Sequence, residues 1–124
     1  MDHIDAEARL LGIRQVLEEI SRDFQAAPNT VFLTGDMNAT PDEISMIEVG
    51  ALVTPSLIDA SREVVNTYHG YRGGSGFEST AGVKIDYIFT NINDRLIKAY
   101  AWEDENKGIY LSDHYPVVCE FDFS

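Results

Sequence analysis

The stretch Lys84-Ile85-Asp86-Tyr87-Ile88-Phe89-Thr90 places one carboxylate inside an otherwise apolar run rich in strand-forming residues. In an extended chain, side chains alternate between two faces, so Tyr87 and Phe89 lie on one face and Asp86 with Ile88 on the other. A carboxylate among apolar neighbours costs free energy unless it has a partner. A structural salt bridge or an oriented histidine would each serve, and we favour a functional role for Asp86.

Two further polar clusters lie at the edges of apolar runs. Gly35-Asp36-Met37-Asn38 follows the predicted strand 30–34. If this segment is extended, Asp36 and Asn38 share a face. A carboxylate beside a carboxamide can fix a cation or a water and can donate to a phosphoryl oxygen. An ordinary turn is the alternative, because Gly, Asp and Asn are turn residues.

The third cluster, Ser112-Asp113-His114, precedes a predicted strand at 116–123. It places a carboxylate and an imidazole at one strand edge. Histidine titrates near neutral pH, which suits it to proton transfer or to phosphate contact. An Asp-His pair is by itself usually a surface dipeptide, and only the other two clusters make it informative.

The first part of the chain has a helical pattern. Apolar residues form one stripe at spacings of 3, 4, 3 and 4, which predicts an amphipathic helix from about Ala6 to Phe24: Leu10, Ile13, Leu17, Ile20 and Phe24. Asp5 can cap its start, and Pro28 lies beyond its end. One apolar stripe implies one packed face, which we expect to cover a sheet.

A second, shorter helix is predicted after the Asp36 cluster. Thr40-Pro41-Asp42-Glu43 has the pattern of a capping box with Pro41 at the first helical position, and Gly50 suits the left-handed residue after the helix end. Further strands are predicted at 84–90, 96–102 and 116–123. The last alternates, so that Glu120 lies on its wetter face.

Glycines crowd the segment between His69 and Gly82, with Tyr68, Tyr71 and Phe77 interleaved. Such a loop within a compact domain is more often functional than idle. Its aromatic and histidine side chains could pack a sugar, a base or another small organic group, or could simply support a long loop. We place His69 and Tyr71 in a candidate substrate-binding group.

The composition is that of one globular domain of 124 residues with a net charge of −12, from 21 acidic and 9 basic residues. This charge disfavours a protein that grips a phosphate backbone by electrostatics alone. It leaves open a nuclease whose metal supplies the positive charge.

The single cysteine, Cys119, excludes an intrachain disulfide and is predicted to be an inert core thiol. No run has the roughly 20 apolar residues of a membrane span, no signal peptide is visible at Met1, and the compartment stays undetermined.

Taken in order, the three clusters resemble the motifs of the endonuclease/exonuclease/phosphatase superfamily, which includes DNase I-like nucleases, deadenylases, sphingomyelinases and inositol phosphatases. The resemblance spans essentially all 124 residues. It implies an α+β fold, part of a DNase I-like two-sheet β-sandwich flanked by helices in four α/β/β/α layers. It also implies a Mg²⁺-dependent phosphoesterase, with Mn²⁺ as the alternative ion, that acts by in-line attack of water.

The resemblance also implies a role for each motif residue. Asp36 would orient the attacking water or bind the metal, and Asn38 would contact the phosphate. Asp113 would bind the metal. His114, held by Asp86, would contact the phosphate or act as a base. Mg²⁺ favours few carboxylates plus water, which agrees with this set.

The start of the chain departs from the family pattern. Met1-Asp2-His3 resembles the last three residues of the family's Thr-His-hydrophobic-Asp-His motif, and the earlier Asn and Glu motifs are absent. We therefore expect residues 1–124 to be the C-terminal portion of a single endonuclease/exonuclease/phosphatase domain. His3 is placed beside the substrate site, as a remnant of that motif.

Three hypotheses follow for the isolated chain. The first is a phosphoesterase; the second, favoured for these 124 residues alone, is a catalytically inactive half that folds or self-associates through an exposed sheet edge, as a structural or interaction module. The third is a Mg²⁺-binding interaction module, which explains the acidity but not the order of motifs. Few cations lie near the motifs (Arg72 and Lys84), so a small phosphate ester or a phospholipid headgroup is favoured over DNA.

Overall fold

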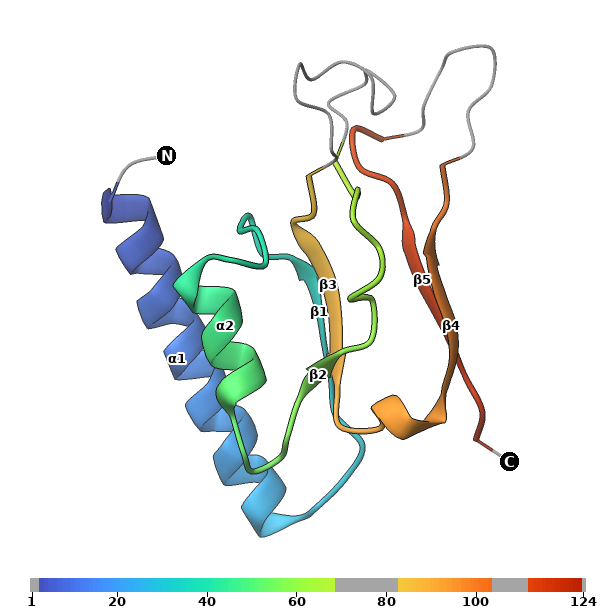
Figure 1. Cartoon of the computed structure of the whole chain (residues 1–124). Helices are drawn as coiled ribbons and strands as arrows, with labels where there is room; N and C mark the ends of the chain where they lie inside the picture. The colour runs from blue at the N-terminus through green and yellow to red at the C-terminus, as the bar shows by residue number, and fades with distance from the viewer. Residues whose placement is uncertain (1–2, 69–82, 104–111, 124) are drawn as a thin grey trace.

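The computed structural model describes residues 3–68, 83–103 and 112–123. Its elements in chain order are α1 (His3–Ala26), β1 (Phe32–Asp36), α2 (Ile44–Ala51), β2 (Ile58–Asp59), β3 (Asp86–Thr90), the 3-10 helix η1 (Asn93–Arg95), β4 (Leu96–Ala101) and β5 (Val117–Phe121). Helices α1 and α2 cover one face of a three-stranded sheet, and β4 with β5 lies on its other side (Figure 1). The α+β class is confirmed, and the described residues contain three of the four predicted layers.

Both sheets are antiparallel. The larger has the strand order β1-β3-β2, and the smaller pairs β4 with β5. In the β1–β3 ladder Asp36 lies opposite Asp86, so pairing of two distant segments brings two of the predicted site carboxylates to one end of the sheet. The Phe32 and Phe121 rings, 5.6 Å apart and edge to face, connect the two sheets.

Strand β3 has the alternation that its sequence predicts. Tyr87 and Phe89 are buried, whereas Asp86 and Ile88 on the opposite face are only partly buried. Both rings enter the core cluster beneath the helices, with Ile13 and Leu17 of α1. The predicted apolar stripe of α1 is therefore its packed face, although the helix is longer than predicted at both ends and Asp5 lies in its first turn rather than before it.

The predicted capping box at 40–43 is wrong. Helix α2 begins only at Ile44, and Glu43, its extended N-cap, makes no side-chain capping bond. The Glu43 carboxylate instead accepts hydrogen bonds from Arg9 of α1 and from Ser45. In a capping box the Glu43 carboxylate would accept from the backbone N–H of the N-cap residue. Here it accepts from the distant Arg9 side chain instead.

The predicted end of this helix is also wrong. Gly50 lies within α2, which continues to Ala51 and stops at Leu52 in an extended conformation. A positive φ is found instead at Gly35 (139°) and at Asn38 (51°). Strand β1 is shifted two residues from the predicted 30–34 because its pairing with β3 continues to Asp36, and Gly35 permits this backbone.

The remaining strands agree with the sequence apart from their ends. Strand β3 begins at Asp86 rather than at Lys84, and the last two strands are shorter than predicted. In β5 only Glu120 is exposed, as expected for its wetter face. Cys119 is only partly buried and lies outside the core cluster, so its predicted core position is wrong. Burial and the charge of Asp59 raise the pKa of its thiol, which agrees with an inert group. Within the described parts of the chain, no helix is long and apolar enough to cross a membrane.

Candidate active site

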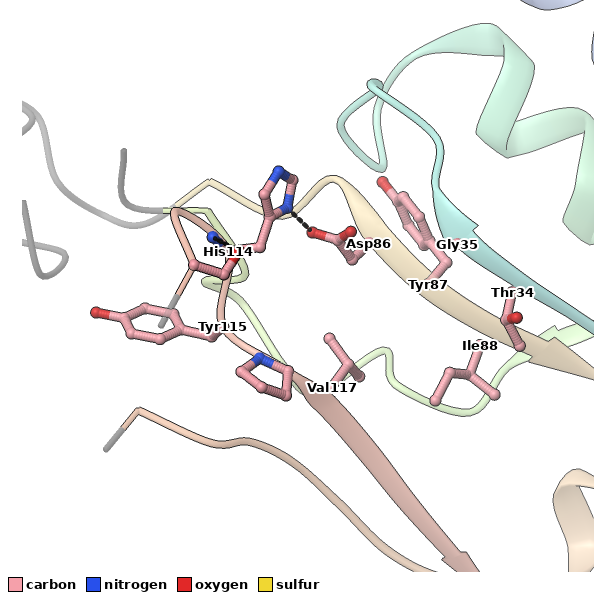
Figure 2. A pocket seen from close by; sticks show the side chains of 10 residues that line it. Thr34, Gly35, Asp86, Tyr87, Ile88, His114, Tyr115 and Val117 are labelled. Atoms are coloured by element: carbon pink, nitrogen blue, oxygen red, sulfur yellow. Dashed lines mark hydrogen bonds and ion pairs between the residues drawn. The ribbon is translucent and has the colours of Figure 1, made fainter. Parts of the chain in front are cut away.

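A hydrogen bond between Asp86 and His114 lies at the centre of the candidate site. Oδ2 of Asp86 is 2.8 Å from Nδ1 of His114, and the two side chains point toward each other from β3 and from the segment that leads into β5 (Figure 2). This pair connects the two sheets. The partner expected for a carboxylate inside an apolar strand is therefore a histidine.

The electrostatics of His114 follow from its neighbours. Partial burial alone would lower the pKa of His114, but the hydrogen bond and charge of Asp86, with the charges of Asp36 and Asp113, raise it above its ordinary value. A neutral ring that donates from Nδ1 to Asp86 leaves Nε2 as an acceptor, whereas a protonated ring presents a donor there. In both forms Asp86 orients the ring.

Asp36 lies on the Nε2 side of this ring. Its Oδ2 is 3.6 Å from Nε2, while its Oδ1 accepts a 2.8 Å hydrogen bond from the backbone N–H of Asn38. Of the two alternatives for this segment, the turn holds beyond Asp36, because Asn38 is left-handed (φ 51°) and closes a turn on the Asp36 carboxylate. Both side chains are exposed at this edge of the sheet.

Asp113 completes the acidic surroundings of His114. Its Oδ1 is 3.8 Å from Nε2. The backbone N–H of His114 donates to Oγ of Ser112 at 3.1 Å, so the Ser112-Asp113-His114 segment is a tight turn before β5. The three predicted carboxylates thus all approach one imidazole, Asp86 at Nδ1 and the other two at Nε2.

The chemistry of these donors fits a hard divalent cation. One ligand atom each from Asp36, Asp86 and His114 lie within 4.8 Å of one another, the one such group of acidic and histidine residues in the described segments. The Asp86–His114 hydrogen bond occupies Nδ1 and so competes with a cation on that side. The carboxylates of Asp36 and Asp113, half-exposed and open to water, supply the oxygen ligands that Mg²⁺ and Mn²⁺ prefer.

A cavity of about 440 Å³ extends from this pair between β3 and β5. Asp86 and His114 line its polar end, and Ile88 and Val117 line its apolar part (Figure 2). The cavity is therefore charged at one end and apolar at the other.

Three predicted substrate-binding residues are not placed here. His69 and Tyr71, with the rest of the glycine-rich segment, lie outside the described residues. His3 is the first residue of α1, and its side chain is likewise outside the description.

Tyr68, one of the aromatic residues expected from the sequence to be able to pack a small organic group, lies edge-on to His114 with a ring-centroid separation of 4.9 Å. The structure also adds two residues that the sequence pattern did not single out as site residues. Thr67 and Lys84 are buried directly behind Asp86. No motif marks Thr67, and Lys84 was noted in the sequence only as a nearby cation. The position of Lys84 at the start of an apolar strand was the one sequence feature that could have indicated a buried, functionally relevant lysine.

No protein-family model and no curated protein matches this sequence. Solved structures do. A mannosyl-6-phosphatase from Bacteroides thetaiotaomicron is 24% identical, with a TM-score of 0.74 over 99% of this chain and 49% of its own. An endonuclease/exonuclease/phosphatase family protein from the same organism is 24% identical, with a TM-score of 0.69 over 99% and 47%. An AP endonuclease from Archaeoglobus fulgidus is 22% identical, with a TM-score of 0.65 over 96% and 56%.

The likeness to these proteins extends along nearly the whole of this chain, but the chain spans only about half of their length. Their shared architecture agrees with the helices and paired sheets described above. The chain therefore has the endonuclease/exonuclease/phosphatase fold.

Proposed function

We propose that the chain carries part of the active site of a metal-dependent phosphoesterase. The observation that supports this most is the orientation of His114. Asp86 holds its Nδ1 at 2.8 Å, and this directs Nε2 toward the carboxylates of Asp36 and Asp113. One carboxylate is enough to orient a structural histidine. Two further carboxylates beside Nε2 are expected where the histidine shares a site with a cation and a phosphate.

The proposed residues divide the reaction between them. Asp36 orients a water molecule, Asn38 donates to a phosphoryl oxygen, and His114 either contacts the phosphate or takes the water's proton at Nε2. Water oxygen bonds to phosphorus as the ester P–O bond breaks, and the leaving alcohol oxygen takes a proton from solvent water. A divalent cation held by Asp36 and Asp113 would stabilise negative charge on the phosphoryl oxygens.

A small phosphate ester is the proposed substrate, and a sugar phosphate or phospholipid headgroup would fit this class. The whole chain has a net charge of −12, and Lys84, the described lysine nearest the site, is buried and bonded internally. Long contacts to a nucleic-acid backbone need exposed cations. Solved structures with this fold include both a mannosyl-6-phosphatase and an AP endonuclease, so nucleic acid is the alternative substrate class.

Residues 1–124 are proposed to be the C-terminal portion of a longer endonuclease/exonuclease/phosphatase domain. The chain spans about half of its structural neighbours, and the Glu motif that the family resemblance places at the metal is absent from it. We infer that the isolated chain is catalytically inactive and that the complete domain is the enzyme.

Hydrolysis of bis-p-nitrophenyl phosphate separates these possibilities. With Mg²⁺ or Mn²⁺ the isolated chain should release p-nitrophenol no faster than buffer. Turnover that disappears in both Asp36→Ala and His114→Ala would instead show that this half is sufficient.

The site assignment itself is tested in the complete domain. There, His114→Ala and Asp36→Ala should each abolish hydrolysis, whereas Asp94→Ala, in the exposed 3-10 helix, should leave it unchanged. Full activity in the His114→Ala enzyme would remove this residue from the mechanism.

A further inference from the structure

At Asp86, strand β3 has a strand partner on one side only among the described residues. On one side it pairs with β1 along its whole length, but on the other side β2 reaches only Phe89 and Thr90. Within the described residues, the main-chain groups of β3 nearer to Asp86 are met on this second side mainly by side chains. The N–H of Ile88 donates to Oγ of Ser61 at 3.3 Å, and a backbone bond from Ala60 meets its C=O.

Lys84 supplies the next of these contacts. Its ammonium donates to the backbone C=O of Asp86 at 2.9 Å, to Oγ of Ser61 at 2.9 Å and to the Ser61 carbonyl at 3.1 Å. All three of its donors are therefore used. The side chain is only 4% exposed, and Oδ2 of Asp59 lies 3.6 Å from Nζ. Burial lowers the pKa of Lys84, and the charge of Asp59 opposes this effect.

Thr67 occupies the same side of β3. Its fully buried hydroxyl accepts from the backbone N–H groups of Ile85 at 3.0 Å and of Asp86 at 3.2 Å. Its own carbonyl accepts a 2.8 Å bond from the N–H of Tyr115, the residue after His114. One residue thus contacts the backbone on both sides of the Asp86–His114 pair.

Together these two side chains hold both main-chain groups of Asp86: Thr67 accepts from its N–H and Lys84 donates to its C=O. Neither side chain is placed to touch a substrate, since both are buried behind the strand. We propose that Lys84 and Thr67 are positioning residues, which take the place of a missing strand and thereby keep the Asp86 carboxylate on Nδ1 of His114.

This inference rests on the proposed function only in treating Asp86 and His114 as the site. A merely structural role for Lys84 and Thr67 predicts lower stability, with the Asp86–His114 hydrogen bond unchanged in the molecules that remain folded. A positioning role predicts that this bond weakens in the folded state itself. The NMR signal of the Nδ1–H proton of His114 distinguishes the two roles, because this proton lies in the hydrogen bond to Asp86.

The test is proton and nitrogen-15 NMR of the full chain, with the His114 Nδ1–H proton and imidazole nitrogens as the readout. The wild-type chain should show a downfield Nδ1–H resonance, as expected for a histidine that donates to a carboxylate. Lys84→Met and Thr67→Val should each lose this resonance while their amide spectra stay dispersed. Thr67→Ser, which keeps the hydroxyl, should retain it.

Lys98→Met is the matched control. The Lys84 ammonium lies beside the Asp59 carboxylate and 4.5 Å from the centroid of the Tyr87 ring. The Lys98 ammonium has similar neighbours, Glu120 at 3.8 Å and the Tyr100 ring at 5.4 Å, but on the exposed β4–β5 sheet. Its replacement should leave the His114 resonance in place.

Retention of the Nδ1–H resonance in folded Lys84→Met or in folded Thr67→Val would overturn the proposal, and so would its loss in Lys98→Met. If Lys84→Met does not fold, the Thr67→Val and Thr67→Ser pair decides alone. Because the readout requires no turnover, a chain without phosphoesterase activity would contradict the proposed function and leave this result standing.

Discussion

At the scale of the residue, one hydrogen bond organises the site. Asp86 lies on the face of β3 opposite the core, and His114 enters from the turn before β5. Because Asp86 holds Nδ1, the neighbouring carboxylates of Asp36 and Asp113 act on the opposite nitrogen. The same charges that would hold a cation therefore also favour the protonated ring.

Replacing Asp86 by Asn keeps an acceptor for Nδ1–H but removes the charge, so the pKa of His114 should fall. Because the folded-state pKa of His114 is raised, its contribution to stability is fully present below the unfolded value of about 6.5 and is lost as the pH rises through the higher folded value. Asp86→Asn should therefore lower the free energy of unfolding at pH ~5 by about 1 kcal/mol more than at pH ~9. Urea unfolding at both pH values, with an NMR titration of His114, checks this.

Asp113→Asn is the control for this prediction. Asp113 is 3.8 Å from the ring, is more exposed than Asp86 and makes no hydrogen bond to Nδ1. Its effect should have the same sign but be smaller. An equal effect of both substitutions would mean that general charge, rather than the hydrogen bond, sets the pKa of His114.

Addition of Mn²⁺ should broaden NMR signals first at Asp36, Asp113 and His114, because the carboxylates of Asp36 and Asp113 lie 3.6 Å and 3.8 Å from Nε2 of His114. Asp36→Ala should weaken this binding about tenfold or more, as expected for loss of one of few carboxylate ligands. Asp94→Ala, in the exposed 3-10 helix, should not change it. Broadening spread evenly over the acidic surface would contradict a defined cation site.

At the scale of the element, local patterns were reliable where burial supported them. The apolar stripe of α1 and the alternation of β3 both become core faces, because each follows the period of its own secondary structure. The patterns for helix ends failed at Glu43 and Gly50. A carboxylate or a glycine near a helix end has several competing uses, and only the packed structure selects among them.

The connection between α1 and α2 offers one prediction about acid stability. Glu43 accepts from Arg9, and this hydrogen bond, opposed by burial and assisted by Ser45, lowers the pKa of the Glu43 carboxyl. Its stabilisation is present above the unfolded pKa of about 4.5 and is lost as the pH falls through the lower folded value. Glu43→Gln should therefore destabilise the chain at neutral pH by about 1–2 kcal/mol, and progressively less in acid.

Glu48→Gln is a matched control, because Arg14 and Glu48 have the same sequence separation and join the same two helices. The Arg14 side chain is 52% exposed, against 15% for Arg9. The loss of the exposed Arg14–Glu48 pair in Glu48→Gln should therefore barely change the free energy of unfolding measured in urea. Equal losses for the two variants would show that burial does not distinguish these pairs.

The two glycines Gly35 and Gly50 should respond to alanine in opposite directions. Gly35 has φ 139°, which a side chain disfavours, although an added Cβ would meet nothing within 4 Å. Gly35→Ala should therefore destabilise the chain by about 1–3 kcal/mol through the backbone alone. Gly50 lies in α2 with open space around it, so Gly50→Ala should stabilise by roughly 0.5–1 kcal/mol. Thermal unfolding of the two variants measures both signs.

At the scale of the whole molecule, the described residues expose many large apolar side chains. Large apolar side chains are exposed on β4 and just beyond it, including Ile97 (63%) and Trp102 (55%). Where such side chains form a contiguous patch, the patch is typical of an interface. This agrees with a chain that spans about half of its structural neighbours.

The isolated chain should therefore self-associate with increasing concentration, and sedimentation velocity would detect it. Ile97→Lys, which adds a charge on β4, should shift the distribution toward monomer. Val65→Lys, equally exposed at 65% but outside the strands, should have little effect. A wild-type chain that stays monomeric at all concentrations would contradict this prediction.

The fold class, the family resemblance and the motif residues of the candidate site can be read from the sequence alone, because hydrophobic periodicity and motif order are local features of the chain. Which nitrogen of His114 meets which carboxylate was decided only by the tertiary structure, because strands β1 and β3 and the segment before β5 must first pair and pack. The hydrogen bonds of Lys84 and Thr67 to the main chain of Asp86 likewise depend on the tertiary structure. No motif marks Thr67, and the pattern around Lys84 does not show its role, because that role depends on β2, which pairs with β3 only at Phe89 and Thr90 and does not reach Asp86.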